Sequence, residues 1–283
     1  MADRARLAQT LIEARRVVVA VSGGIDSLTL ATFAWGLVPA GLTVSFCFAD
    51  GAAVPKAARS RVHALAEAHG FGDALVVIDA GEVRDPAYLN NPVDRCYHCK
   101  SHLFDAVAAA FPDVVICTGA NLDDVSDFRP GRLAARERAV QEPFITAGFA
   151  KDDVRALARD LGLGALSELP ASPCLSSRVE TGVIIDEAML SAIDAVEERL
   201  REEGARVVRC RIRSGRVVIE HDGLVDDAVV VAVAAPVLAQ HQIHGPIQTA
   251  PYAKGSAFVR PGANDHDVSA SPPRGTRQLR VIS

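Results

Sequence analysis

A segment near the start of the chain combines two glycines, two serines and an aspartate between a strand-like and a helix-like run. Its sequence is SGGIDS, Ser22 to Ser27, and the preceding run VVVAV is apolar and β-branched. Glycines let a backbone approach a phosphate closely, and a helix N-terminus offers unpaired N–H groups and positive potential. A carboxylate such as Asp26 would repel phosphate unless a divalent cation lies between them, which indicates Mg²⁺.

The spacing differs from the Walker loop, since GxxxxGK[ST] is absent. A serine-capped helix whose glycines only serve a turn is the alternative interpretation of SGG. The complete SGGxDS after a β-branched strand favours the phosphate site.

Three of the six cysteines are candidates for chemistry: Cys96 and Cys99, which form a CxxC, and the distant Cys174. Two thiolates one helical turn apart, with a remote third, can hold three irons of a [4Fe–4S] cluster and leave the fourth open. Zinc ligation and a redox pair are the alternatives. Cys47 and Cys117 lie in apolar strand-like runs, which predicts core positions.

Arginines alternate along a predicted hairpin that turns at Ser214-Gly215, so that Arg209, Arg211 and Arg213 share one strand face. Guanidinium groups match carboxylate and phosphate geometry, which predicts an anion site. A solvated edge strand is the alternative. Arg178, in PCLSSR, has the same two interpretations.

The first half of the chain alternates strand and helix patterns, which predicts an α/β fold with a doubly wound parallel sheet. The strands are expected at 17–21, 42–49, 74–80 and 113–119, and the helices at 27–37, 54–69 and 94–111.

The pattern changes after Ala150 and predicts a smaller α+β domain. Helices are expected at 151–161, at 185–203 with Asp186 as cap, and at 224–241, with a loop at 164–182 and the hairpin between the last two helices. We expect two domains, at 1–165 and at 166–260, and a disordered tail at 261–283.

Composition limits the classes of function. The chain has 283 residues with 49% hydrophobic, enough for a sizeable core, and a net charge of −5. An acidic chain without a long basic stripe favours a small anionic substrate over a large nucleic acid. The most apolar stretch, Ala228 to Ala239, is too short to span a bilayer, and the first residues lack the apolar core of a signal peptide. We therefore expect a cytoplasmic protein without a membrane partner.

The SGGIDS segment resembles the PP-loop of the adenine nucleotide alpha hydrolase superfamily, a HUP-like fold whose members split ATP between the α and β phosphates. Three further segments resemble the LarE family of sulfur transferases: NNPVDRCYHCKSHLF, TGANLDDVSDFRPG and PASPCLSSR. The resemblance extends to about Glu220. It implies an adenylating ATP pyrophosphatase that converts a carboxylate of pyridinium-3,5-biscarboxylic acid mononucleotide to a thiocarboxylate, for nickel-pincer nucleotide biosynthesis.

The resemblance also makes 1–165 the PP-loop ATP-binding domain and 166–260 the substrate and sulfur-transfer domain, and it implies roles for particular residues. Adenine recognition is expected around Ala49 to Gly51. Catalytic roles fall on Cys174, Arg178 and Lys100; nucleotide contacts on Ala20, Ser22, Gly23, Gly24, Asp26, Ser27, Gly119 and Arg129; metal ligation on Asp26, Cys96, Cys99, Cys174 and Glu220; and substrate binding on Arg209 and Arg211. Asp123, Asp124 and Asp127 are further Mg²⁺ candidates, and Asn121 a turn cap.

Two questions stay open at this point. Cys174 either gives up its own sulfur and becomes dehydroalanine, as in the single-cysteine branch of the family, or ligates a cluster with Cys96 and Cys99. The rival functions are an amide-forming PP-loop enzyme resembling NAD synthetases, a tRNA thiolase, and a non-catalytic nucleotide or iron–sulfur binding protein. Family resemblance further implies a homo-oligomer.

Overall fold

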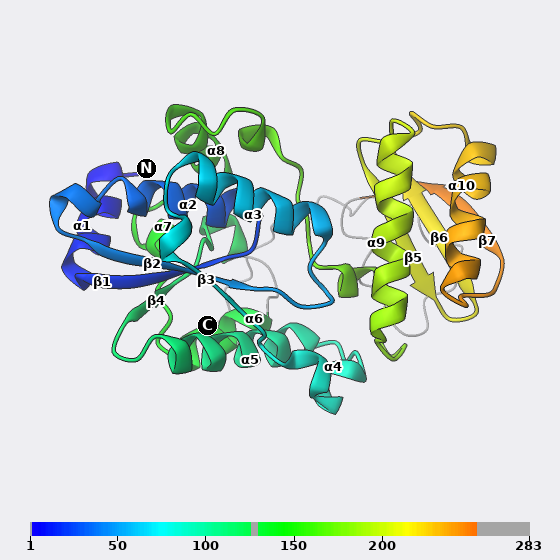
Figure 1. Cartoon of the computed structure of the whole chain (residues 1–283), viewed down its shortest axis with the longest axis horizontal. Coiled ribbons are helices and arrows are strands. Elements are labelled where there is room, and N and C mark those ends of the chain that lie inside the picture. Colours follow the sequence, from blue (N-terminus) through cyan, green and yellow to red (C-terminus); the bar gives the residue numbers. More distant parts are fainter. Residues whose placement is uncertain (1, 126–129, 254–283) are drawn as a thin grey trace, which may run out of the picture.

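The computed structural model describes residues 2–125 and 130–253. Figure 1 shows a larger lobe around a twisted sheet and a smaller lobe that holds a second sheet. The strands of the first sheet are β1 (Arg16–Val21), β2 (Thr43–Ala49), β3 (Leu75–Ile78) and β4 (Val115–Cys117). All are parallel, in the order β3-β2-β1-β4.

Helices cover both faces of this sheet, which confirms the predicted α/β class (Figure 1). Val17 and Val19 face one core, and Val18 between them faces another, because side chains alternate along a strand. The first core is closed by α1 (Arg4–Ala14), α2 (Ile25–Trp35), α3 (Lys56–Ala68), α7 (Pro143–Thr146) and α8 (Lys151–Asp160). The opposite core is closed by α5 (Arg95–Ala110) and α6 (Pro130–Glu137), while the short α4 (Pro86–Leu89) precedes α5.

The burial of the strands explains why their sequences are so apolar. Val17, Val18 and Val19 are at most 1% exposed, as expected for a central strand covered on both faces. Cys47 and Cys117 are fully buried, which confirms their predicted core positions. β3 lies at the edge and leaves Val76 and Val77 partly exposed.

The smaller lobe contains a three-stranded mixed sheet, ordered β5-β6-β7. Its strands are β5 (Val208–Arg213), β6 (Arg216–His221) and β7 (Ile247–Pro251), and its helices are α9 (Glu187–Glu202) and α10 (Asp227–Gln240). β5 and β6 form the predicted antiparallel hairpin, with Gly215 in the turn at φ +74°. Asp186 caps α9 as predicted, accepting from the Ala188 N–H.

The segment 164–182 was predicted as loop, and the structure corrects this in part. It forms 3₁₀ turns at Gly164–Glu168 and Leu175–Arg178. Ser167 and Ser177 donate their hydroxyls to carbonyls three residues earlier, which stabilises such short turns without an apolar repeat. The tail predicted from residue 261 lies outside the described residues.

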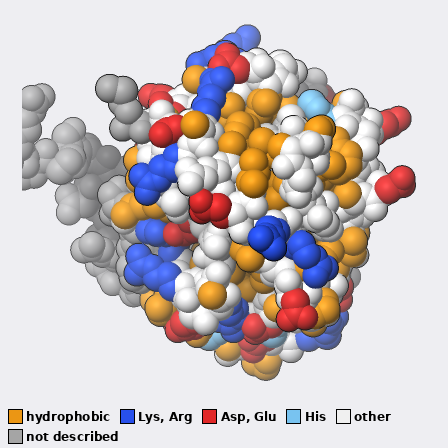
Figure 2. Space-filling model, turned by 90° about the vertical axis from the view of Figure 1, so that its left-hand side faces the viewer, with side chains coloured by type: hydrophobic (Ala, Val, Ile, Leu, Met, Phe, Trp, Pro, Cys, Tyr) orange, Lys and Arg blue, Asp and Glu red, His pale blue; other side chains and the backbone are white. Residues whose placement is uncertain are grey.

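The described residues contain no helix with the length and apolarity needed to span a membrane. On the face of the larger lobe seen in Figure 2, acidic and basic side chains are interspersed, with no continuous basic stripe.

Candidate functional site

The phosphate loop, Ser22 to Ser27, joins the carboxyl end of β1 to the N-terminus of α2. The Ser22 N–H donates to the Ser27 hydroxyl at 3.0 Å, and the two hydroxyl oxygens lie 3.1 Å apart. The helix N-cap is Gly24, and no side chain accepts a hydrogen bond there. The serine-capped alternative is therefore wrong, and the first turn of α2 keeps the unpaired N–H groups that an anion requires.

A second loop, which follows β4, lies directly against this first turn. A Cβ on Gly119 would come within 2.7 Å of the Asp26 carbonyl carbon and the Ser27 nitrogen, so only glycine fits without movement. β4 and β2 flank β1 on opposite sides, which makes the gap between β1 and β4 the point where strand order reverses. Ligands of open α/β sheets bind at such a switch point, outside the carboxyl ends of the strands.

Asp26 is held by two partners. The Lys151 Nζ lies 2.8 and 2.6 Å from its two carboxylate oxygens, and the Asn121 amide donates to it at 3.2 Å. Lys151 begins α8, and sequence reasoning missed it because the contact joins residues far apart in the chain. The predicted Mg²⁺ role of Asp26 stays a prediction, and Lys151 adds a cation beside the phosphate loop.

The loop after β4 shows the predicted turn cap. Asn121 accepts from the Asp123 N–H, and Asp124 accepts from the Asn121 N–H. Asp123 and Asp124 thus lie near Asp26, but their Mg²⁺ roles stay predictions. Asp127 and Arg129 lie outside the described residues.

The three candidate cysteines gather where the two lobes meet. Cys99 and Cys174 both pack against the core of the smaller lobe. Burial and nearby negative charge, including the Cys174 thiolate, raise the pKa of Cys99 to about 12 despite Lys100. Cys96 is exposed, yet the protein atoms around its sulfur and the Cys174 thiolate raise its pKa as well. The three thiols therefore lie within electrostatic range of one another.

The cluster and zinc roles of these three cysteines stay predictions. Within the described ranges, no three His, Cys, Asp or Glu side chains stand close enough together to ligate one ion. A cluster distributes its thiolates over separate irons and so tolerates wider spacing. Burial raises the pKa of Cys96 and Cys99 and so favours their protonated thiols, whereas bound iron would favour the thiolates.

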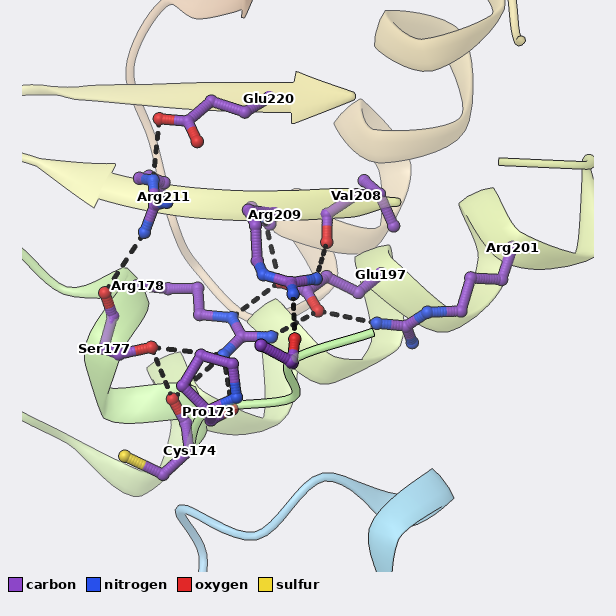
Figure 3. Close-up of polar contacts among 12 residues, drawn as sticks. Pro173, Cys174, Ser177, Arg178, Glu197, Arg201, Val208, Arg209, Arg211 and Glu220 are labelled. Carbon is purple, nitrogen blue, oxygen red and sulfur yellow. Dashed lines mark hydrogen bonds and ion pairs between the residues drawn. The ribbon is translucent and has the colours of Figure 1, made fainter. Parts of the chain in front are cut away.

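Cys174 is presented by a tightly held loop. The Arg178 guanidinium donates to the Pro173 carbonyl at 2.6 Å and to the Cys174 carbonyl at 3.0 Å. Figure 3 shows this carbonyl directed at Arg178, whereas the sulfur points away from the arginines. Tyr88 adds a second support, with its hydroxyl 2.5 Å from that of Ser176.

A buried glutamate fixes Arg178 in turn. Glu197 accepts from Arg178 Nε and Nη2, both at 2.9 Å, and from Arg201 at 2.8 Å. Burial would raise the pKa of Glu197, but the hydrogen bonds and positive charge of Arg178 lower it instead. Arg178 is thus fully engaged by protein groups, and the predicted catalytic role stays a prediction. Glu197 was missed, although it lies on the apolar face of its helix between Ile193 and Leu200.

The hairpin arginines are buried, which makes the solvated-edge interpretation wrong. Arg209 is 7% and Arg211 is 4% exposed. Arg209 donates to the Ala171 carbonyl, and Arg211 donates to Glu220 at 2.7 Å and to the Ser177 carbonyl at 3.2 Å (Figure 3). Both arginines face the Cys174 loop. Glu220, predicted as a metal ligand, forms an ion pair with Arg211, and its metal role stays a prediction.

Two other predicted residues take up positions consistent with the site. Ala20 lies in β1 just before the phosphate loop and is buried. Lys100 lies on α5 with its ammonium 5.9 Å from the Phe104 ring centre. Burial raises the pKa of Cys96 and Cys99, and the charge of Lys100 only partly offsets this rise. A small hollow lined by Arg16, Thr43 and other residues lies at the opposite, amino end of the strands, away from this chemistry.

The phosphate loop and the Cys174 loop both lie at the carboxyl end of the parallel strands. β1 and β2 pair as neighbours, so the phosphate loop and the segment after β2 leave the sheet side by side. The Leu175 N–H donates to the Ala53 carbonyl at 2.8 Å, which fixes the Cys174 loop to that segment. The sequence predicted the phosphate loop and the Cys174 segment, and the structure adds the hydrogen bond from Leu175 to Ala53 that brings the Cys174 loop beside β1 and β2.

Comparison with known proteins gives three similar sequences. The chain is 34% identical to an uncharacterized protein of Synechocystis sp. over 76% of this chain and 79% of the relative. It is 30% identical to the pyridinium-3,5-bisthiocarboxylic acid mononucleotide synthase of Lactiplantibacillus plantarum, over 77% of this chain and 78% of that enzyme. An uncharacterized protein of Methanocaldococcus jannaschii is 28% identical over 73% and 77%. No family model matches the chain.

Proposed function

The chain belongs to the LarE family of sulfur transferases, and we propose that it uses ATP to convert a carboxylate of pyridinium-3,5-biscarboxylic acid mononucleotide to a thiocarboxylate. The observation that carries the proposal is that the Leu175 N–H fixes the Cys174 loop to the segment after β2, which leaves the sheet beside the uncapped phosphate loop. The product serves a nickel-pincer nucleotide cofactor.

The first half-reaction belongs to the phosphate loop. A substrate carboxylate oxygen attacks the α-phosphorus of ATP, the bond to the β-phosphate breaks, and pyrophosphate leaves with its electron pair. The N–H groups of the first turn of α2 and the hydroxyls of Ser22 and Ser27 hold the departing phosphates. Asp26 would hold Mg²⁺, which would neutralise these phosphates together with the neighbouring Lys151 ammonium.

The second half-reaction belongs to the smaller lobe. A sulfur nucleophile attacks the carbonyl carbon of the acyl-adenylate, and AMP leaves as a far better leaving group than oxide. Arg209 and Arg211 lie buried beside the Cys174 loop and are suited to hold the anionic groups of the substrate. Arg178 fixes the loop that carries the sulfur.

The source of the transferred sulfur defines the finer proposal. We favour Cys96, Cys99 and Cys174 as ligands of a [4Fe–4S] cluster, because their thiols lie within electrostatic range of one another. Such a cluster supplies an open iron that can carry an extra sulfide for transfer. If Cys174 is instead the donor, its Cβ–S bond breaks by elimination of the Cα proton, and dehydroalanine remains.

The test is a single-turnover reaction with anaerobically purified protein, ATP, Mg²⁺ and the dicarboxylate mononucleotide. We expect thiocarboxylate product, about four irons per chain and an unchanged protein mass. An iron-free chain that forms product and loses roughly 34 Da, the mass of H₂S, makes Cys174 the sacrificed donor.

Two variants complete the test. Cys174→Ala should abolish thiocarboxylate formation, whereas Cys47→Ala, in the core of the sheet, should retain it. Full activity of Cys174→Ala would favour an amide-forming or other PP-loop enzyme. ATP binding without any pyrophosphate release, with substrate present, would instead favour a non-catalytic nucleotide-binding protein.

A further inference from the structure

A half-buried arginine outside the predicted motifs lies directly behind the phosphate loop. Arg61, on α3, donates from its Nε to the Gly23 carbonyl at 2.8 Å. Its Nη2 is enclosed by protein and has no hydrogen-bond partner among the described residues. Nothing in the sequence motif points to this residue, since α3 follows the next strand of the sheet.

The same helix forms the back wall of the loop through a second residue. Gly23 has a φ of +73°, and a Cβ there would lie 2.4 Å from the carbonyl oxygen of Ala58. Ala58 and Arg61 are three residues apart and therefore lie on one face of α3. This face holds the Gly23 backbone from behind.

Peptide geometry transmits the Arg61 contact to the front of the loop. The Gly23 carbonyl and the Gly24 N–H belong to one planar peptide group, and the described chain contains no cis peptide bond. In a trans peptide these two groups point in opposite directions. By holding the carbonyl toward α3, Arg61 turns the Gly24 N–H away from α3, toward the open side of the helix N-terminus.

The charge of Arg61 is also uncompensated. No carboxylate forms an ion pair with it in residues 2–125 and 130–253, and its one hydrogen bond goes to a neutral carbonyl. Burial, and the nearby charge of Arg201, lower the pKa of Arg61. A half-buried cation with an enclosed nitrogen and no counter-charge is poorly solvated, so an anion that arrives with the ligand would stabilise it.

We propose that Arg61 is a positioning residue of the phosphate loop: it holds the Gly23 carbonyl so that the Gly24 N–H faces the bound phosphates, and its unpaired charge favours that anion. The inference rests on the proposed function, in which this loop binds the pyrophosphate part of ATP. Arg61 acts through Gly23 and does not touch the nucleotide itself.

The experiment measures binding of magnesium pyrophosphate and of magnesium ATP by calorimetry, with KM for ATP, kcat and thermal melting measured in parallel. Arg61→Met should weaken pyrophosphate binding about tenfold to a hundredfold, the loss expected for one charged hydrogen bond, and raise KM for ATP in proportion. Arg61→Lys keeps the charge but loses the guanidinium fork, so its loss should be smaller than that of Arg61→Met. Lys56→Met is the matched control, because Lys56 is an exposed cation on the same helix.

Pyrophosphate affinity of Arg61→Met and Arg61→Lys equal to wild type, or a loss matched by Lys56→Met, would overturn the inference. A lower melting temperature with unchanged affinity would also overturn it, because a purely structural role predicts that pattern. If the wild-type protein binds neither pyrophosphate nor ATP, the phosphate-loop assignment fails and this inference falls with it. Tight binding by the wild type without sulfur transfer would contradict only the proposed function.

Discussion

The phosphate loop and the arginine cluster around Cys174 (Arg178, Arg209 and Arg211) differ in whether their arginines have carboxylate partners. At the loop, the first turn of α2 has no side-chain cap, and Arg61 behind it has no carboxylate partner in the described residues. In the cluster, Arg178 pairs with Glu197, and Arg211 pairs with Glu220. Arg61 therefore lacks the carboxylate partner that Arg178 and Arg211 already have.

At the loop, the missing negative charge has to come from a bound ligand. In the cluster, carboxylates of the protein itself pair with Arg178 and Arg211. An anion that enters the loop completes it, as expected for a pyrophosphate site. An anion that reaches the cluster must share arginines with Glu197 and Glu220. Arg209, which donates to two carbonyl oxygens, is the member of the cluster best placed to receive it.

The largest expected effect comes from breaking the cluster. Glu197→Gln removes the charge that pairs with the fully buried Arg178, and leaving a buried charge unpaired costs about 3–5 kcal/mol. The free energy of unfolding in urea should fall by this amount. Glu198→Gln, at the exposed neighbouring position, should change it by less than about 1 kcal/mol. Equal losses in the two variants would contradict a structural role for Glu197.

The next effect concerns the loop. Gly23→Ala forces a Cβ against the Ala58 carbonyl at a φ of +73°, which costs about 1–3 kcal/mol of local strain. ATP binding should weaken at least about tenfold, because the strain falls on the phosphate-binding backbone. Gly72→Ala meets no atom within 4 Å and is the matched control. Unchanged ATP affinity in Gly23→Ala would refute the assignment of this backbone.

These two predictions show which parts of the molecule the sequence could supply. The parallel sheet and the loop follow from local patterns, VVVAV before SGGIDS, and the structure has them where expected. Glu197, Lys151 and Arg61 act through partners 19, 125 and 38 residues away, so no local spacing reveals them. The arginines of the hairpin were recognised, but their pairing with Glu220 within a buried sheet face required the fold.

A smaller effect on stability is expected at the edge of the loop. Lys151 pairs with Asp26, and both side chains are about a quarter exposed, so solvent screening limits the contribution of the pair to less than about 1 kcal/mol. Lys151→Met should therefore leave the melting temperature nearly unchanged while lowering pyrophosphate formation about a hundredfold. Arg159→Gln, an exposed position on the same helix, should have neither effect. A matching fall in melting temperature and activity would make Lys151 structural.

The last prediction concerns the pH dependence of stability, which arises from buried thiols and from Glu197. Burial raises the pKa of Cys47 to about 11 and that of Cys117 to about 12 in the larger lobe. Since the folded values lie above the unfolded value near about 9, this stability is complete below pH 9 and is lost as pH rises toward 11–12, by about 1 kcal/mol per thiol at pH 10. Glu197 has a lowered pKa, so its contribution is instead lost on acidification below its ordinary range.

Melting curves at pH 8 and pH 10 check the alkaline part. Cys117→Ala should lose less stability over this interval than wild type does. An identical pH dependence in the two proteins would show that the Cys117 thiol does not contribute.

The most direct test of the account is the position at which ATP is cut. The protein is incubated with Mg²⁺, the pyridinium dicarboxylate mononucleotide and ATP labelled in the α-phosphate, and the nucleotide products are separated. The account predicts AMP and pyrophosphate in equal amounts, formed only when the dicarboxylate is present. ADP and inorganic phosphate would contradict it, because a loop that holds pyrophosphate for an adenylation cannot yield them.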